Sequence, residues 1–479
     1  MRPRIDGPAD HGPFAPHLAS DGLRDAPAVA ELFLGIFHRD LLAFFPQTNF
    51  EPLLDDSEPI IQSGPNFRLF QDPVNAETVI ELFGIPYRLR TGEGDSLSQH
   101  DLRMVQAIGA VLSLRYHHLF QMTNSARLEL YRGGSEDHYV AAFVEPSAYE
   151  PSALVPSRIA ATIQTLRTAA LSTYENHRVS TGALLLGPAD DPFHVIAQTP
   201  PDALPYGVEL TGLKSIHRLC DGDRTMFLVD RVGKLSGIVD VGRWADETPR
   251  GLVGDELCAR TYVPHARATR LSGHVCVVLS PNQEIKLFAD GTQTFAFRHG
   301  RWRLLDPRAK FAAWSEAVAD VALARTLFHA ALNLAEVRRG ALFLVIDDPS
   351  SAVGRLISTS DLLTDEVPDS PPTVLSPRDP LARRALHYLA RGRFVGDLDS
   401  SVLEALASLD GALAVDQSGC LLAFGAILRH DVSDLPGLAA AEGARTTAAL
   451  VASRYGAVLK VSEDGVISCF LGGARAWDL

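Results

Sequence analysis

The sequence has few of the features that mark membrane, secreted or nucleic-acid-binding proteins. Its longest apolar runs, such as residues 341–346, fall far short of the roughly 18–20 residues that cross a bilayer, and no signal-type apolar region is present near its start. Five cysteines without a Cys-x-x-Cys pair argue against a disulfide framework or a zinc knuckle. A net charge of −14 disfavours contact with a nucleic-acid backbone. We therefore expect a cytoplasmic protein that binds neither membranes nor nucleic acid.

Length and patterning predict several domains of mixed α/β class. The chain has 479 residues, 46% of them hydrophobic, which is enough for about three domains. Residues 1–28 mix Pro, Asp, Gly and His without periodicity, so we expect a flexible tail there. We expect an N-terminal α/β domain at 29–150, and two further units, at 151–306 and 313–479, each with a mixed central sheet flanked by helices.

One helix of the N-terminal domain is strongly predicted. Ser98 with Asp101 three residues later fits a capping box, and the apolar residues that follow share one helical face. These residues are Leu102, Val105, Ile108, Leu112, Tyr116 and Leu119. The helix resembles the closing helix of a GAF-type sensory domain, and an ordinary core helix is the alternative.

The rest of the chain repeats itself in three ordered blocks. "LRTAALSTYENHRVSTGALLLGPADDP" (166–192) matches "LFHAALNLAEVRRGALFLVIDDP" (327–349), each with an Ala- and Leu-rich helix followed by a Gly-Ala-Leu strand. "LCDGDRTMFLVDRVGKLSGI" (219–238) matches "SLDGALAVDQSGCLLAFGA" (408–426), and residues 259–291 match 444–473. The spacing agrees, since Asp230 to Arg260 is 30 residues and Asp416 to Arg445 is 29. This order predicts a tandem duplication, with the proline-rich segment 368–380 as a loop inserted in the second copy.

The second copy resembles the diadenylate cyclase domain of the DNA-integrity-scanning and membrane cyclases that make cyclic di-AMP. The resemblance rests on the "GALFLVID" strand, on "LDGALAVD" with its Asp-Gly-Ala motif, on "EGARTTAAL" and on "VSEDGVIS". The Asp-Gly-Ala motif alone is weakly specific, but the four segments occur in the family's order. The chain is thus interpreted as a divergent member with a degenerate tandem copy.

The resemblance implies roles for individual residues. In that family the motif aspartate helps to place a metal ion and the ribose 3′-hydroxyl, and an arginine-containing loop holds the triphosphate. On this basis Asp410 is the candidate catalytic and metal-binding residue, and Arg445 is the second catalytic candidate. Mg²⁺ or Mn²⁺ is the implied cofactor if the site is catalytic. The nucleotide-binding candidates are Gly411, Ala412, Gly443, Arg445, Thr446, Thr447, Ser462 and Glu463.

The arginine loop departs from the family pattern. Where the family usually has Arg-His-Arg after Gly-Thr, this chain has "GARTT" at 443–447. Attack of a 3′-hydroxyl on an α-phosphorus builds charge on phosphoryl oxygens and on the departing pyrophosphate, so catalysis depends on positioning and charge neutralisation. Threonine brings no charge, and each charge-assisted hydrogen bond contributes about 1.5–3 kcal/mol. We expect binding to survive this change better than turnover.

The first copy has lost more of the motif. Asp221 and Gly222 persist but Asp223 replaces the alanine, and the loop at Arg260 reads "CARTYVPH". We expect a structural role for it, or a binding surface without catalysis. Because the family's active site forms where two domains meet face to face, we also expect the two cyclase-like domains to pair within or between chains.

Simpler interpretations of the singled-out residues stay open. Asp410 before Gly411 fits an ordinary turn. Arg445 fits an anchor for Glu442 or another carboxylate, and "SEDG" at 462–465 fits a plain hairpin turn.

Three functions are therefore considered. The favoured one is a nucleotide-binding pseudoenzyme for second-messenger signalling, which senses a nucleotide or cyclic dinucleotide with weak or no catalysis. The alternative is an active diadenylate cyclase, a nucleotidyltransferase that condenses two ATP to cyclic di-AMP and pyrophosphate. The third is an interaction scaffold that has lost its ligand.

Overall fold

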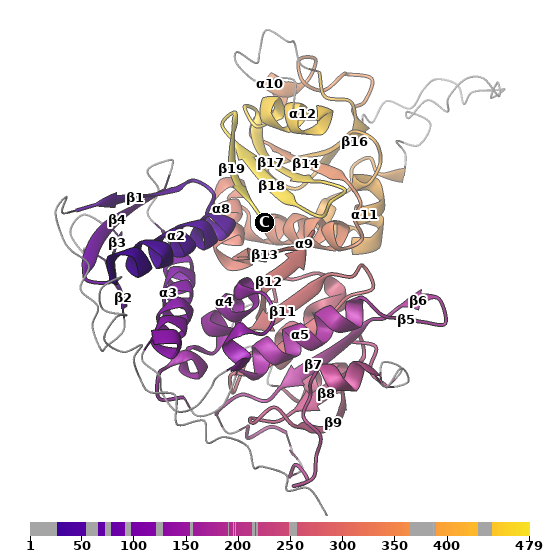
Figure 1. Cartoon of the computed structure of the whole chain (residues 1–479). Coiled ribbons are helices and arrows are strands. Elements are labelled where there is room, and N and C mark those ends of the chain that lie inside the picture. Colours follow the sequence, from indigo (N-terminus) through magenta and orange to yellow (C-terminus); the bar gives the residue numbers. More distant parts are fainter. Residues whose placement is uncertain are drawn as a thin grey trace, which may run out of the picture. The chain divides into compact units, whose positions relative to one another are not determined.

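The computed structural model is a mixed α/β protein (Figure 1). It describes residues 26–53, 66–71, 78–91, 97–120, 128–153, 157–363, 387, 389–429 and 443–479, with gaps at 190, 195, 197, 213–215, 217–218 and 249–255. The chain divides into two compact units, Met1–Thr165 with His299–Arg303, and Leu166–Arg298 with Leu304–Leu479. The α/β class with several domains is confirmed, and the finer boundaries at 150 and 306 stay predictions.

The first unit combines helices with one antiparallel sheet. Its strands β1 (Thr48–Pro52), β2 (Phe67–Gln71), β3 (Thr78–Leu82) and β4 (Ile85–Thr91) are ordered β1-β4-β3-β2. Its helical elements are α2 (Ala26–Phe44), α3 (Gln99–Phe120), η1 (Leu128–Tyr131), α4 (Ser135–Val144) and η2 (Pro146–Tyr149). Phe37 of α2 contacts Phe67 of β2, with ring centroids 5.5 Å apart, and both are buried. Aromatic side chains thus join helix and sheet in one core.

Helix α3 begins where the sequence predicted. The Ser98 hydroxyl donates to the Asp101 carboxylate at 2.7 Å, and the Asp101 amide donates back to the hydroxyl at 3.1 Å, so the capping box is confirmed. The predicted apolar face is buried at every position except Leu119, which is 52% exposed near the end of the helix. The predicted flexible tail lies outside the described residues apart from 26–28, which belong to helix α2.

The second unit is built around two larger sheets. We call its residues before 299 the first repeat and its residues from 304 onward the second repeat. The first repeat contains β5 (Thr173–Tyr174), β6 (His177–Arg178), β7 (Thr181–Leu185), η3 (Val208–Gly212), β8 (Thr225–Val229), β9 (Leu235–Asp240), α6 (Val241–Glu247), η5 (Arg260–Tyr262), α7 (Val263–Ala268), β10 (Val275–Leu279), β11 (Ile285–Ala289) and β12 (Thr292–Arg298). Two elements, α5 (Arg158–Ala170) and β13 (Arg301–Leu304), cross the boundary between the units.

The second repeat follows the same plan with longer helices. It contains α8 (Pro307–Val318), α9 (Val321–Glu336), β14 (Ala341–Ile346), α10 (Pro349–Ala352), η7 (Val395–Asp397), α11 (Ser400–Ala407), β15 (Ala412–Asp416), β16 (Leu421–Ala426), α12 (Ala444–Ala452), β17 (Gly456–Val461), β18 (Ile467–Leu471) and β19 (Ala474–Asp478). The inserted loop predicted at 368–380 lies outside the described residues.

The sheets of the two repeats have the same topology. The strand order is β12-β11-β10-β7-β8-β9 in the first repeat and β19-β18-β17-β14-β15-β16 in the second. The central strand is parallel to the next strand along the chain in both cases, β7 with β8 and β14 with β15. It is antiparallel to its other neighbour, β10 or β17. Corresponding strands are those that the three matched sequence blocks predicted, and tandem repetition of one unit produces this arrangement.

Equivalent turns show which residues of the first repeat correspond to which residues of the second. The Oδ1 atom of Asp230 accepts the amides two and four residues later at 3.0 and 2.7 Å, and Asp416 does the same at 2.9 and 2.9 Å. The hairpins at 280–284 and 462–466 are each closed by a bond from the first amide to the last carbonyl, at 2.8 and 2.9 Å.

The strand register corrects one detail of the sequence match. The match aligned Gly182 with Gly340. In the sheets, Gly182 pairs with Val278 and Leu342 pairs with Lys460, and each partner precedes its hairpin by two residues. Gly182 therefore corresponds to Leu342, because register follows cross-strand pairing rather than a shared Gly-Ala-Leu string.

The core of the second repeat lies on both faces of its sheet, with α9 and α12 on opposite sides (Figure 1). All six residues of β14 are buried. Alternate residues Ala341, Phe343 and Val345 join the cluster with α9 and α11. Leu342, Leu344 and Ile346 join the cluster with α12. This period of two is what a strand buried on both faces requires.

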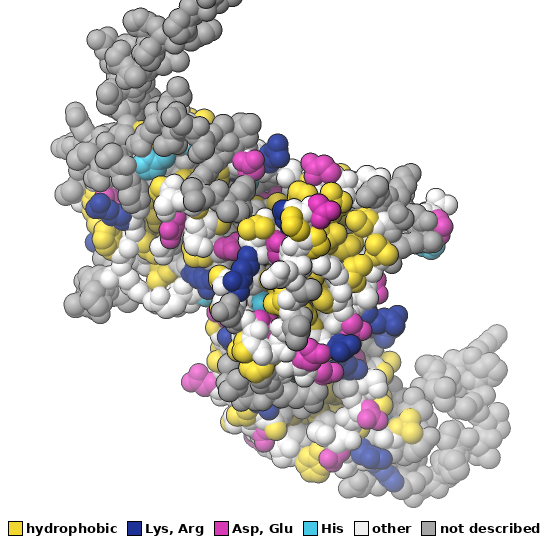
Figure 2. Space-filling view, turned by 90° about the horizontal axis from the view of Figure 1, so that it is seen from below, with side chains coloured by type: hydrophobic (Ala, Val, Ile, Leu, Met, Phe, Trp, Pro, Cys, Tyr) yellow, Lys and Arg dark blue, Asp and Glu magenta, His cyan; other side chains and the backbone are white. Residues whose placement is uncertain are grey.

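The surface and the cysteines agree with a globular chain. No helix in the part of the chain that the structure describes combines the length and apolarity needed to span a bilayer. All five cysteines are free, and four of them are buried as small apolar residues, as predicted, while Cys420 is partly exposed. On the face seen in Figure 2, basic side chains are scattered among acidic ones.

The equivalence of the two aspartate turns can be measured. Asp230→Ala and Asp416→Ala each remove an acceptor for two turn amides, so we expect each to lower the free energy of unfolding by about 1–2 kcal/mol. The corresponding Asn variants keep the oxygen acceptor and serve as controls with a smaller loss. Urea unfolding is the measurement, and a loss at one turn only would contradict their equivalence.

Candidate functional site

The motif segments of the second repeat meet at one edge of its sheet. Gly340 precedes β14, Asp410 precedes β15, Glu463 follows β17, and Arg445 lies in the first turn of α12. Strand β15 runs parallel to β14, and β17 runs antiparallel to it. The starts of two strands and the end of the third therefore share an edge.

Arg445 is the residue that joins these segments. Its Nη2 atom lies 3.4 Å from Asp410 Oδ1, and its Nη1 atom lies 3.2 Å from Glu463 Oε1. The Arg445 side chain is 38% exposed, while those of Asp410 and Glu463 are 92% and 75% exposed. Ion pairs this exposed are weak, so the guanidinium can exchange a carboxylate for another anion. The alternative in which Arg445 anchors a carboxylate is also seen, with Asp410 and Glu463 as partners, and Glu442 lies outside the described residues.

Gly340 is a part of this site that the sequence interpretation missed. A Cβ atom at Gly340 would lie 2.0 Å from Arg445 Nη1 and 2.9 Å from Cζ. The guanidinium thus lies directly against the Gly340 backbone, and only glycine leaves that space. The sequence shows a glycine immediately before a fully apolar strand, which could have indicated a close contact at Gly340. Nothing in the sequence linked this glycine to Arg445.

Lys460 is a second cation that the sequence interpretation missed. Its Nζ atom donates to Thr446 Oγ1 at 2.8 Å, so Thr446, which is buried, holds a lysine beside the first turn of α12. The signal was a single lysine in the otherwise apolar strand "GAVLKV", two residues before the hairpin. The described site therefore contains two basic side chains, Arg445 and Lys460, and the two carboxylates that contact Arg445.

The other predicted residues shape the chain around this edge. Gly411 has φ 112, and a Cβ there would lie 2.4 Å from the Gly425 carbonyl carbon, so the backbones approach closely. Ala412 is buried at the start of β15. Gly443 precedes α12, and its carbonyl accepts the amides of Thr446 and Thr447 at 2.8 and 3.3 Å.

The hairpin that carries Glu463 is a plain turn in its backbone. Ser462 Oγ bonds to the Asp464 carboxylate and, at 3.2 Å, to the Val466 carbonyl. The hairpin interpretation of "SEDG" is therefore confirmed for the backbone, and Ser462 supports the turn. Asp410 and Glu463 offer oxygen ligands that suit Mg²⁺ or Mn²⁺. A metal role for Asp410 stays a prediction.

The equivalent arginine of the first repeat has a different use. Arg260 Nη2 donates to Ser400 Oγ and Glu404 Oε1 of α11, both at 2.7 Å, and its amide donates to Asn333 of α9 at 2.7 Å. Asp221 Oδ1 accepts three backbone amides at 2.8–3.0 Å. Burial opposes ionisation of Asp221, but these bonds outweigh it and hold its pKa below the ordinary value. Arg260 and Asp221, which are what the first repeat keeps of the motif, thus both make structural contacts.

The contact between the repeats is not reciprocal. The arginine edge of the first repeat meets helices α9 and α11 of the second, while Arg445 contacts residues of its own repeat. A face-to-face pair related by a two-fold axis would place both arginines alike. The repeats therefore meet head to tail within this chain, and pairing between chains stays a prediction.

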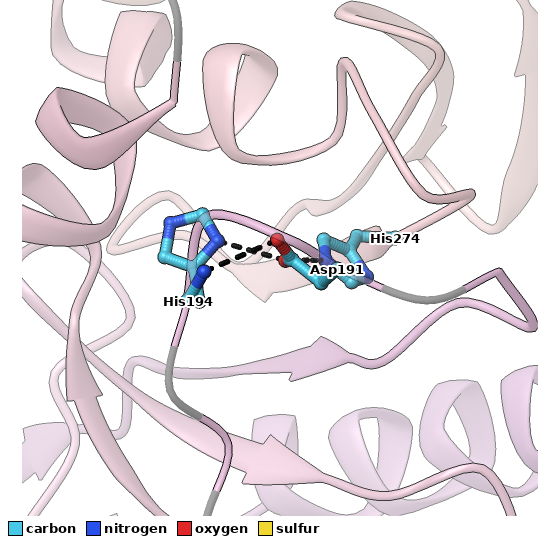
Figure 3. Close-up of side chains that lie close together, drawn as sticks. All are labelled: Asp191, His194 and His274. Carbon is cyan, nitrogen blue, oxygen red and sulfur yellow. Dashed lines mark hydrogen bonds and ion pairs between the residues drawn. The ribbon is translucent and has the colours of Figure 1, made fainter.

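A separate polar cluster lies in the first repeat (Figure 3). The ligand-type atoms of Asp191, His194 and His274 all lie within 4.8 Å of one another, and the three side chains are 3–4% exposed. His194 Nδ1 and His274 Nε2 lie 2.7 and 2.6 Å from the same Asp191 oxygen. The sequence signal was Asp-x-x-His at 191–194, and the distant His274 gave none.

Hydrogen bonding assigns the protons of this cluster. The Gly187 amide donates to His274 Nδ1 at 2.8 Å, so the His274 proton is on Nε2 and points to Asp191. His194 Nε2 donates to the Trp244 carbonyl at 2.9 Å, and its ring stacks on Trp244 with centroids 3.9 Å apart. A zinc ion with bonds of about 2.0–2.2 Å would hold its ligand atoms further apart than these contacts, and would displace the Nε2 proton. We interpret the cluster as a hydrogen-bond network around the Asp191 carboxylate that fixes the loop after β7.

The Asp191 carboxylate is ionised by its partners. Burial raises its pKa, but hydrogen bonds from His274, from the Phe193 amide and from His194 outweigh this effect, so its pKa lies below the ordinary value. The carboxylate therefore contributes stability above the pKa of an unfolded aspartate, and this contribution disappears as the pH falls through the lower folded value.

Comparison with known proteins adds little to this geometry. No family model and no curated protein matches the chain. Two solved structures show limited similarity. A double mutant of DacA from Staphylococcus aureus is 19% identical, with 33% of this chain and 86% of that chain covered and a TM-score of 0.21. A hypothetical membrane spanning protein from Bacillus cereus is also 19% identical, with 35% and 76% covered and the same TM-score of 0.21. TM-scores this low assign neither a fold nor an activity to this chain.

The Asp191 cluster gives a pH-dependent prediction. Asp191→Asn removes the charge between two histidines, and we expect a loss of about 3 kcal/mol in unfolding free energy at pH 7. The difference from wild type should shrink as the pH falls below about 3.9, where the unfolded aspartate is protonated. Denaturant unfolding at several pH values measures this, with the exposed Asp202→Asn as control. A melting temperature raised by Zn²⁺ in wild type but not in Asp191→Asn would instead indicate a metal centre.

Proposed function

We propose that the second repeat binds a phosphate group of a nucleotide or cyclic dinucleotide at Arg445, as a divergent diadenylate-cyclase-like sensor with weak or no catalysis. One observation carries this proposal. Asp410 and Glu463, which lie 35 and 18 residues from Arg445 in the chain, both contact its guanidinium. Three of the four segments that carry the sequence resemblance thus converge on one partly exposed cation.

The chemistry of the edge suits an anionic ligand. A guanidinium presents paired donors that match phosphate oxygens, and its present ion pairs are exposed enough to exchange. Arg445 also lies in the first turn of the nine-residue helix α12, whose positive dipole end favours anions. Lys460 adds a second positive charge close behind Thr446.

The same charges argue against efficient catalysis. Two carboxylates contact Arg445, and threonines stand where the family has cationic side chains. Transfer between two triphosphates develops far more negative charge than binding of a cyclic dinucleotide does, and preorganised cations must stabilise it.

An active diadenylate cyclase is the alternative function, and Lys460 is the observation that favours it. It supplies one cation that the "GARTT" loop lacks. Asp410 and Glu463 would hold Mg²⁺ or Mn²⁺ together with substrate phosphates, since such ions are bound by a few carboxylates plus phosphate oxygens. In that case the metal would supply the remaining charge at the reacting phosphate.

Catalysis is tested directly with ATP and Mg²⁺ or Mn²⁺. We expect little or no cyclic di-AMP from the purified protein, because the loop has one of the family's three usual phosphate-binding residues. Chromatography with mass detection measures the product. Efficient production that Asp410→Asn abolishes would refute the sensor proposal and establish the cyclase.

Binding is tested at Arg445. We expect Arg445→Ala to weaken ATP or cyclic di-AMP binding by about 1.5–3 kcal/mol, a factor of roughly 10 to 150, with little change in melting temperature. Gly340→Ala keeps every charge but displaces the guanidinium, so it should weaken binding to a smaller extent. Calorimetric titration is the measurement, and affinity should fall with added salt.

The matched control is Arg475→Ala. Arg475 is 39% exposed and pairs with Asp478 at 3.7 Å, so its exposure and pairing resemble those of Arg445 at a different place on the repeat. We expect this control to bind as wild type does. If Arg445→Ala also binds as wild type, or if it lowers the melting temperature instead, then the arginine is a structural anchor and the proposal fails.

A further inference from the structure

A cluster of charged side chains lies where the two repeats meet. We call it the interface ion cluster, and its members are Glu284, Lys286, Arg298, Glu336 and Arg338. Lys286 is fully buried and contacts Glu336, and it lies 3.3 Å from Glu284. Strands β11 and β12 of the first repeat supply the lysine and Arg298, while helix α9 and the turn after it supply Glu336 and Arg338 (Figure 1).

Glu284 is the centre of this cluster. It is 5% exposed, and each of its oxygens receives a different arginine. Arg338 Nη2 donates to Oε1 at 2.8 Å, and Arg298 Nε donates to Oε2 at 3.0 Å. Burial alone would raise the pKa of Glu284, but Lys286, Arg298 and Arg338 lower it below the ordinary value. The carboxylate is therefore ionised and holds both arginines at fixed distances.

The Glu463 hairpin and Gly340 lie on two sides of Arg445, and we call them the two walls of the candidate site. Each of the two arginines is linked to one of these walls. Arg298 Nη1 donates to the Gly465 carbonyl at 2.9 Å, and Gly465 closes the hairpin that carries Glu463. A Cβ at Gly465 would lie 3.0 Å from that Nη1 atom, so the glycine permits the close approach.

The second arginine, Arg338, is linked to the wall formed by Gly340. Arg338 lies two residues before Gly340, the glycine against which Arg445 rests. Its φ of 54 is in the left-handed region, which residues with side chains adopt only when their surroundings hold them there. The bond to Glu284 is such a restraint.

We propose that Glu284 of the first repeat is a positioning residue for the site of the second repeat, because through Arg298 and Arg338 it sets the spacing between the Glu463 hairpin and Gly340. Arg445 lies between these two walls. A preorganised site loses less freedom when a ligand binds, so the degenerate repeat serves as a scaffold that improves the affinity of the intact one. The ligand part of this inference rests on the proposed function.

The contacts of Glu284 with Arg298 and Arg338 can be distinguished from the contacts that only join the two repeats. Lys286 and Glu336 pair with each other, and Tyr262 donates to Glu336 Oε1 at 3.2 Å, without touching either wall of the site. Arg260 adds the contacts to α11 at 2.7 Å. Removing the charge of Glu284 therefore leaves the contacts of Tyr262 and Arg260 and the pair of Lys286 with Glu336 in place, while Lys286 loses its second charged partner.

The experiment compares Glu284→Gln with Glu256→Gln by hydrogen exchange and by titration. Glu256 is a matched control, because it also receives two arginines, Arg267 at 3.0 Å and Arg270 at 2.6 Å, but within the first repeat. In Glu284→Gln we expect the amides of 337–340 and 462–466 to exchange about 10-fold faster, through local opening, with β14 and β17 unchanged. ATP or cyclic di-AMP affinity should fall about 5-fold or more. Glu256→Gln should leave both measurements as in wild type.

Arg298→Gln removes only the link between Glu284 and the Glu463 hairpin. It serves as the second variant if Glu284→Gln does not fold. It should speed exchange at 462–466 and leave exchange at 337–340 as in wild type. Unchanged exchange at the walls in the variants that fold, or equal loosening by Glu256→Gln, overturns the positioning role. Faster exchange with unchanged affinity overturns its effect on the ligand. Faster exchange in a protein whose wild type binds no nucleotide supports the positioning role and identifies the proposed function as the part that fails.

Discussion

The arrangement of the second repeat depends on the burial of its central strand. Because β14 is buried on both faces, it must be covered by helices on both sides and paired on both edges. Its parallel partner β15 requires a long connection, and its antiparallel partner β17 follows α12 and continues through a hairpin into β18. These pairings alone bring the segment before β14, the segment before β15 and the turn after β17 to one edge. The candidate site is thus a consequence of strand direction, and α12 needs only to place Arg445 over it.

The two repeats show how one scaffold supports two uses of the same arginine. In the first repeat the edge is covered by α9 and α11, and Arg260 is held by Glu404 and Ser400. In the second repeat, Arg445 is partly exposed, and its ion pairs with Asp410 and Glu463 are weak because both carboxylates are exposed. The first repeat contacts the edge of the second repeat only at its border, through Arg298 on the Gly465 carbonyl, and leaves Arg445 partly exposed. Arg260 of the first repeat instead forms part of the joint between the repeats.

Sequence patterns predicted what depends on local order, and missed what depends on register. The α3 capping box and the repeated strands follow from periodicity and from motif order. The choice of Asp410, Arg445 and Glu463 came from the resemblance to the cyclase family, and the structure places these three side chains in contact. Gly340 and Lys460 could not be connected to Arg445, because a shift of one residue in either strand would turn them away. Glu284 was beyond reach for another reason. Its partners Arg298 and Arg338, and the Gly465 carbonyl that accepts from Arg298, are brought together by the packing of one repeat on the other, which no local pattern encodes.

The charge balance of the edge decides which ligands it suits. The carboxylates of Asp410 and Glu463 balance the positive charges of Arg445 and Lys460, so these four groups carry no net charge once all are ionised. A ligand with many phosphate charges would meet both carboxylates and would need a divalent cation between them. A cyclic dinucleotide carries one charge per phosphate, and exchange of one carboxylate for one phosphate on the guanidinium leaves the local charge nearly unchanged. Because the energetic cost of bringing like charges together grows with their number, the proposed nucleotide site is expected to favour a ligand with separated single charges over a pair of triphosphates.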